Sequence, residues 1–201
     1  MADPTTLAID VAFLLPHSLN HSLTALNRTL RLTPDGFQFD ATHLPHLTLV
    51  QQFAKENDLE EITRVIKDLL PHQAPVELVT TRISHAHVAS TLGIRRTDEL
   101  VALHRRLLGG LAPFRARADG RDAFWTDGDT PRTADIEWVA MFREQASLER
   151  FDPHITIGVG AIAAHVDTTS FAAAELALCH LGRFCTCRRV LSAWTLTAPG
   201  R

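Results

Sequence analysis

Apolar residues follow two kinds of spacing that alternate along this chain. Short apolar runs and two-residue alternation, which are typical of β-strands, occur at residues 7–15, 46–53, 76–83, 88–94, 154–159, 174–181 and 190–197. Apolar residues three and four positions apart, which are typical of amphipathic helices, occur at residues 19–30, 58–70, 100–108 and 133–146. The pattern therefore predicts an α+β fold with a helix and several strands in each half of the chain.

Turn and cap residues set the expected limits of these elements. Thr97 is a good N-cap for the third helix, and Gly109-Gly110 is expected to end it. Residues 113–131 are rich in Pro, Gly and charged side chains, so they are predicted to form a loop. No Gly/Ser-rich linker separates the halves, so we treat residues 1–201 as a single two-lobed domain.

Charge and cysteine content restrict the classes of function. The net charge is -3 and the basic residues are scattered, which disfavours binding to an extended duplex nucleic acid. No apolar run is long enough to span a bilayer, and the first apolar stretch lacks a basic leader and contains Asp10, so a cytoplasmic protein without a membrane partner is expected. The cysteines Cys179, Cys185 and Cys187 include no Cys-x-x-Cys pair, and a structural role is favoured over a metal site.

One five-residue pattern, Pro-His-apolar-Thr-apolar, occurs twice. Residues 45–49 read PHLTL and residues 153–157 read PHITI, so that His46 and His154 are 108 positions apart. With the composition of this chain, two such copies should arise by chance in about one of ten thousand sequences. We therefore interpret the pair as a functional signal rather than as two ordinary strand histidines that follow turn prolines.

Strand geometry gives each motif a polar face. Successive side chains point to opposite faces of a strand, so His46 shares a face with Thr48, and His154 with Thr156. Two imidazoles and two hydroxyls suit a phosphate group: opening a cyclic phosphodiester requires a base, an acid and donors to the non-bridging oxygens. Free imidazole titrates close to neutral pH, so one ring can be neutral while the other is protonated. The sequence leaves open which of the two is the base.

The paired motifs resemble those of the two-histidine (2H) phosphoesterases, which include the bacterial 2'-5' RNA ligase-like proteins and cyclic nucleotide phosphodiesterases. The signature of that superfamily is two His-x-Thr-x tetrapeptides, each commonly preceded by Pro. The resemblance implies a bilobed fold of pseudo-two-fold duplicated β-α-β units, with mostly antiparallel sheets around a central cleft. It also implies that His46 and His154 are catalytic, that Thr48 and Thr156 bind the substrate phosphate, and that neither a metal nor another cofactor is needed.

Three further residues are candidates for substrate contact. By strand alternation, Gln52 is expected on the face of His46 and Thr48. Phe124 and Trp125 lie in the predicted loop, where aromatic side chains could stack on a base or equally anchor the loop to the core. The chain has no tyrosine, which leaves the expected base-binding pocket undefined.

Other conspicuous residues are assigned to the structure of the protein. Trp138 and Trp194 are expected to pack in the core. His104 is expected at the surface of the third helix or partly buried.

These observations support three hypotheses. The first is a monomeric, metal-independent phosphodiesterase that hydrolyses a 2',3'-type cyclic or 2'-linked phosphodiester of a nucleotide or RNA end, with 2'-5' RNA ligation as the reverse reaction. The second is a non-catalytic nucleotide-binding module. The third, a histidine-bound metallohydrolase, is disfavoured because few acidic residues neighbour the motifs in the sequence.

Overall fold

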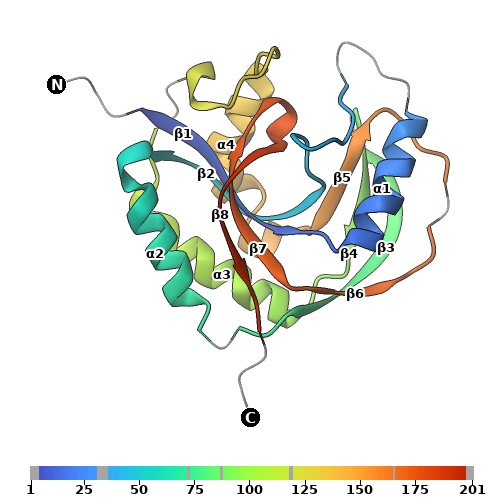
Figure 1. The fold of residues 1–201 in the computed structure, drawn as a ribbon, viewed down its shortest axis with the longest axis horizontal. Coiled ribbons are helices and arrows are strands. Elements are labelled where there is room, and N and C mark those ends of the chain that lie inside the picture. The colour runs from blue at the N-terminus through green and yellow to red at the C-terminus, as the bar shows by residue number, and fades with distance from the viewer. Residues whose placement is uncertain are drawn as a thin grey trace.

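The computed structural model describes residues 5–30, 36–71, 73–86, 88–117, 120–164 and 166–197. Within them the chain forms two four-stranded antiparallel sheets (Figure 1). The first sheet has the order β2-β1-β7-β8 and consists of β1 (Thr6–Leu14), β2 (His46–Lys55), β7 (Glu175–Leu181) and β8 (Cys187–Thr195). The second has the order β5-β4-β3-β6 and consists of β3 (Val76–Ala86), β4 (Ala89–Ile94), β5 (His154–Val159) and β6 (Ser170–Ala173).

Helices cover both sheets. The α-helices are α1 (His17–Thr29), α2 (Leu59–Leu69), α3 (Asp98–Leu111) and α4 (Thr133–Gln145). Short 3-10 turns span Glu56–Asp58, Ala112–Phe114, Arg121–Ala123, Leu148–Arg150 and Arg183–Cys185. Helices α2 and α3 lie side by side next to the first sheet, α4 contacts β2, and α1 lies against β5 of the second sheet (Figure 1). In the described part of the chain, no helix combines the length and apolar character needed to cross a membrane.

The main core includes buried apolar residues of both sheets and of the helices that cover them. Strand β1 is buried along nearly its whole length, and its residues Ile9, Val11 and Phe13 belong to the same apolar cluster as Ile62 and Ile66 of α2. Full burial of such a side chain contributes about 1.5–3 kcal/mol to stability. The strands that carry the site are therefore held by a substantial core.

The structure confirms the predicted α+β class with mostly antiparallel sheets. Strand β6 (Ser170–Ala173) was not predicted, and the predicted end of the third helix is wrong. Helix α3 continues through Gly109 and Gly110 instead of ending there. A Cβ atom on Gly110 would lie 2.7 Å from Cδ1 of Leu69, so this glycine allows α3 to approach α2 closely.

Candidate active site

The two motif strands occupy equivalent places in the two sheets. Strand β2 is the edge of the first sheet and β5 is the edge of the second, and the two strands contact each other. His46, Thr48, His154 and Thr156 all line one cleft with a volume of about 610 Å³. Ligand sites commonly have volumes of about 300–1,000 Å³, so the structure brings the four predicted residues together around a space that can hold a nucleotide-sized ligand.

A β-bulge follows the threonine in each motif. In the first sheet Thr48 pairs with Ala12 and Val50 with Val11, which leaves Leu49 unpaired. In the second sheet Thr156 pairs with Thr91 and Gly158 with Ser90, which leaves Ile157 unpaired. The internal duplication therefore extends beyond the motif itself to the irregularity that follows it.

A buried helical side chain binds the carbonyl of each bulged residue. His104 of α3 donates from Nδ1 to the Leu49 oxygen at 2.7 Å, and Asn27 of α1 donates from Nδ2 to the Ile157 oxygen at 2.8 Å. A Cβ atom on Gly158 would lie 2.7 Å from Asn27 Nδ2, so glycine leaves room for this amide. Both helical side chains are fully buried, and they satisfy carbonyls that the bulges remove from the ladder.

The contacts of His104 define its protonation state. Because Nδ1 donates to a carbonyl, Nε2 is free to accept the Leu148 N–H at 3.0 Å. Burial lowers the pKa of His104, and the hydrogen bond to the Leu49 carbonyl opposes that shift only in part. His104 is therefore held as a neutral imidazole, more deeply buried than the sequence predicted.

Both motif histidines are oriented in the same way. His46 Nδ1 lies 2.8 Å from the Leu44 oxygen, and His154 Nδ1 lies 2.8 Å from the Asp152 oxygen. A carbonyl oxygen can only accept, so Nδ1 carries the hydrogen in both rings. The Nε2 atom of each ring takes no part in this hydrogen bond, so it can contact other groups.

A buried carboxylate distinguishes the first motif from the second. Asp10 Oδ2 lies 3.5 Å from His46 Nε2 and accepts hydrogen bonds from the Thr48 hydroxyl at 2.7 Å and from the Gln51 amide at 2.9 Å. Burial raises the pKa of Asp10, although His46, Gln51 and Thr48 all act to lower it. By strand register, Ala89 occupies the position in the second sheet that Asp10 occupies in the first. The second motif therefore has no carboxylate at this position.

The prediction for Gln52 is wrong because of the first bulge. The unpaired Leu49 shifts the alternation by one residue, so Gln51 takes the face of His46 and Thr48. The Gln52 side chain is 1 % exposed, and its amide donates to the Leu111 oxygen and accepts from Arg143, both at 3.0 Å. Strand alternation predicts a face only where the ladder is regular.

Phe124 and Trp125 do not line the cleft. Phe124 is 3 % exposed and packs edge-on against Phe53. Trp125 lies against His180 and beneath the Arg189 guanidinium, and its backbone N–H donates to the Leu181 oxygen. Of the two functions considered for these aromatic residues, the structure supports loop anchoring.

The aromatic side chain at the cleft is instead Trp138 of α4. It is 40 % exposed, lines the cleft, and donates from Nε1 to Gln51 Oε1 at 3.0 Å. The expectation that it packs in the core is wrong, because Asp135, Val139 and Phe142 form the buried stripe of α4 and Trp138 lies beside that stripe. Helical spacing alone could not have revealed this exposed position, because Trp138 is three residues after Asp135 and four before Phe142, which is the spacing of a shared face.

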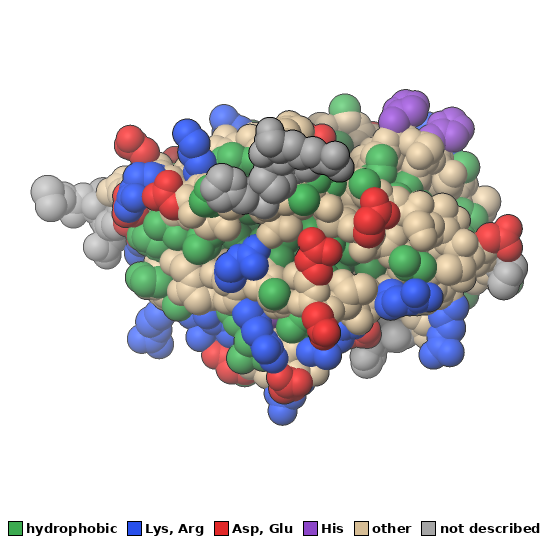
Figure 2. Space-filling view, turned by 90° about the horizontal axis from the view of Figure 1, so that it is seen from below, with side chains coloured by type: hydrophobic (Ala, Val, Ile, Leu, Met, Phe, Trp, Pro, Cys, Tyr) green, Lys and Arg blue, Asp and Glu red, His purple; other side chains and the backbone are tan. Residues whose placement is uncertain are grey.

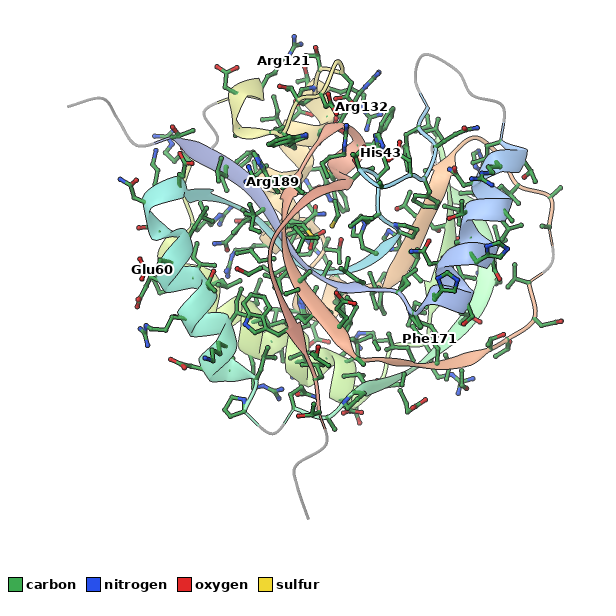
Figure 3. The ribbon with its side chains drawn as sticks, viewed as in Figure 1. His43, Glu60, Arg121, Arg132, Phe171 and Arg189 are labelled. Carbon is green, nitrogen blue, oxygen red and sulfur yellow. The ribbon has the colours of Figure 1, made fainter. Side chains whose placement is uncertain are left out.

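A cation and an aromatic ring border another part of the cleft. The Arg132 Cζ atom lies 4.0 Å above the centre of the Phe184 ring, and both residues line the cleft. Phe184 packs against Phe37, which in turn stacks on His43; Figure 3 labels Arg132 and His43. On the face drawn in Figure 2, Lys and Arg side chains lie among Asp and Glu side chains. The Arg132 guanidinium is already paired with the Asp135 carboxylate, so an anion in the cleft would share it with that residue.

Comparisons with known proteins agree with this geometry. None of the curated protein sequences matches the chain significantly. The crystal structure of TT0787 of Thermus thermophilus is similar, with a TM-score of 0.59, 15 % identity and coverage of 96 % of this chain and 100 % of that one. Escherichia coli LigT complexed with NADP+ gives a TM-score of 0.60, and LigT complexed with 3'-AMP gives 0.59; each has 17 % identity and covers 96 % of this chain and 99 % of LigT. The model of the 2'-5' RNA ligase superfamily matches residues 28–189, and the chain therefore belongs to that superfamily.

Proposed function

We propose that this protein is a 2H-type phosphodiesterase that hydrolyses a 2',3'-type cyclic or 2'-linked phosphodiester of a nucleotide or RNA end. One observation carries the proposal: two His-x-Thr strands from different sheets line one cleft, and the same backbone contact orients both imidazoles. Membership of the superfamily supports this class of reaction. Hydrolysis is the expected activity because water is the abundant acceptor.

The reaction uses both histidines on one phosphorus centre. One ring takes a proton from water as the water oxygen bonds to phosphorus. The other gives a proton to the sugar oxygen as its bond to phosphorus breaks. The hydroxyls of Thr48 and Thr156 donate to the non-bridging oxygens, where negative charge increases. Ligation of a 2'-hydroxyl to a cyclic phosphate end is the same chemistry with an alcohol in place of water.

The cleft also offers a place for the nucleoside. Trp138 presents a partly exposed indole and Arg132 a guanidinium backed by Phe184. Base stacking on an aromatic side chain contributes about 1–3 kcal/mol. The LigT structures with 3'-AMP and ATP are consistent with a nucleotide as the ligand of this fold.

A non-catalytic nucleotide-binding module is the second candidate, and the contacts of Thr48 are the reason to retain it. Its single hydroxyl proton is directed to Asp10, so a substrate phosphate must compete with this carboxylate for the first-motif donor. Thr156, in contrast, makes no hydrogen bond through its hydroxyl to any residue that the structure describes.

The test is a panel of 2',3'-cyclic mononucleotides, 2'-5' dinucleotides and RNA with a cyclic phosphate end, incubated with chelator-treated protein. The position of the product phosphate identifies the bond that breaks. Calorimetry with AMP and CMP is run in parallel. Turnover in chelator supports the proposed phosphodiesterase, whereas tight binding without product from any substrate contradicts it and supports the module.

A further inference from the structure

The geometry points to a binding site for a thiophilic divalent cation, of which Zn²⁺ is the best example, formed by Asp10, His46 and Cys187 beneath the cleft. One potential ligand atom from each residue lies within 4.8 Å of the other two. The three residues come from β1, β2 and the start of β8. The N–H of Leu44 donates to the Cys187 oxygen at 3.1 Å, and this bridge brings the thiol to the first motif.

The contact between His46 and Asp10 requires a positive charge. His46 carries its hydrogen on Nδ1, so a lone pair on Nε2 faces Asp10 Oδ2 at 3.5 Å. That oxygen already accepts from Thr48 and Gln51. Two opposed lone pairs repel each other unless a proton or a metal ion lies between them.

Two details favour a metal ion over a proton alone. The other carboxylate oxygen of Asp10, Oδ1, is buried and has no hydrogen-bond partner among the described residues, although buried polar atoms are normally paired. A metal ion bound by both carboxylate oxygens would satisfy Oδ1, whereas a proton between Nε2 and Oδ2 would not. The thiol of Cys187, which also contacts the Cys179 side chain, lies close enough to both groups to serve as a third ligand.

The separation of His46 Nε2 and Asp10 Oδ2 matches a known preference of zinc. Zn–N and Zn–O bonds of about 2.0–2.2 Å place neighbouring ligands of a tetrahedral site about 3.3–3.5 Å apart, and the Nε2–Oδ2 distance is 3.5 Å. The hydrogen bond from His46 Nδ1 to a backbone carbonyl is the usual outer contact of a metal-bound histidine. Binding forms bonds from the ion to oxygen, nitrogen and sulfur and releases the thiol proton to solvent, with no change of oxidation state.

The predicted consequence is inhibition, which rests on the proposed function. The metal would occupy the Nε2 lone pair that His46 needs for proton transfer. Zinc binding and turnover would then exclude each other.

The binding test uses chelator-treated protein. Zn²⁺ is titrated in competition with a chromophoric chelator, and Co²⁺ is added separately to record a thiolate-to-metal charge-transfer band. Cys187→Ser should abolish the band and weaken Zn²⁺ binding by more than the about 10- to 100-fold that is typical of losing an outer contact. Asp10→Asn should weaken it similarly. His154→Ala is the matched control: it removes the other motif histidine and should leave Zn²⁺ affinity unchanged.

Cys187→Ala serves as a second variant, and circular dichroism verifies that each variant is folded. Equal Zn²⁺ affinity in wild type and in both Cys187 variants, or a Co²⁺ complex without the thiolate band, contradicts the site. These readouts need no substrate, so they decide the metal site even if the phosphodiesterase proposal fails.

Turnover then tests the inhibition. Wild type should lose activity as one equivalent of Zn²⁺ binds, whereas the turnover of Cys187→Ser, measured relative to its own rate in chelator, should resist Zn²⁺. An increase in turnover with Zn²⁺ overturns the inhibitory role.

Discussion

The two halves of the cleft share their geometry but differ in their electrostatics. Each has a His-x-Thr motif at a sheet edge, a bulge directly after it and a buried helical side chain that binds the bulged carbonyl. Among the described residues, a carboxylate lies beside the motif histidine in the first half, at Asp10, whereas the second half has Ala89 at that position. The comparison teaches that duplication preserves the placement of the two motif histidines, while single residues outside the motifs give the two histidines different surroundings.

The largest expected effect comes from the motif histidines, which both halves of the cleft share. His46→Ala and His154→Ala should each reduce kcat by about 10²- to 10⁴-fold, because each removes a positioned acid or base. Turnover of a 2',3'-cyclic mononucleotide is the measurement. His43→Ala, which removes a nearby histidine paired with Asp40, is the control and should retain activity. Wild-type turnover in either motif variant would exclude that histidine from the chemistry.

Substitution of the two motif threonines should have different effects in the two halves of the cleft. Thr48→Val and Thr156→Val should each lower kcat by about 10- to 100-fold, since each removes a donor to a charged phosphate. Only Thr48→Val should also lower the free energy of unfolding, by about 1–3 kcal/mol, because buried Asp10 loses a hydrogen bond. Urea unfolding measures this difference. Equal stability of the two variants would show that the Asp10 contact is energetically unimportant.

Substitution of Trp138 tests whether the nucleoside binds in the half of the cleft that contains the first motif. It reaches Asp10 through Gln51, whereas the second half has Val159 at the position of Gln51. Trp138→Ala should raise KM by about 5- to 150-fold, which corresponds to the loss of one stacked base. Trp125→Ala is the matched control away from the cleft and should leave KM unchanged. A raised KM for Trp125→Ala together with an unchanged KM for Trp138→Ala would indicate that Trp125, and not Trp138, contacts the substrate.

The smallest effect concerns the bulge contacts. His104 binds the first bulge with a pKa lowered mainly by burial, whereas Asn27 binds the second and cannot titrate. The unfolded chain takes up a proton at the ordinary histidine value of 6.5, and folded His104 resists protonation, so the free energy of unfolding should fall as pH drops below that value. His180, whose pKa is also lowered by burial, should add to the fall.

The check is urea unfolding of wild type and His104→Gln at about pH 7.5 and about pH 5.5. The variant should lose less stability on acidification than wild type. An identical pH dependence in both proteins would mean that His104 is readily protonated in the folded state.

Much of the site could be predicted from sequence because it is encoded locally. Proline, histidine and threonine at fixed spacing define a strand with one polar face, and the residues between them define its buried side. Gln52 and Trp138 show where this reasoning stops. Gln52 was misplaced because a bulge is a property of the pairing with β1, and Trp138 because exposure depends on which side of α4 meets the sheet.

The sequence by itself determined the motif strands, their polar faces and the α+β class, since these depend on residue type and on periods of two and 3.6 residues. Only the tertiary structure decided that β2 and β5 line one cleft, that Gln51 replaces Gln52, and that Asp10 and Cys187 lie beside His46. Those relations depend on strand register and on contacts between residues far apart in the chain, which no local pattern contains.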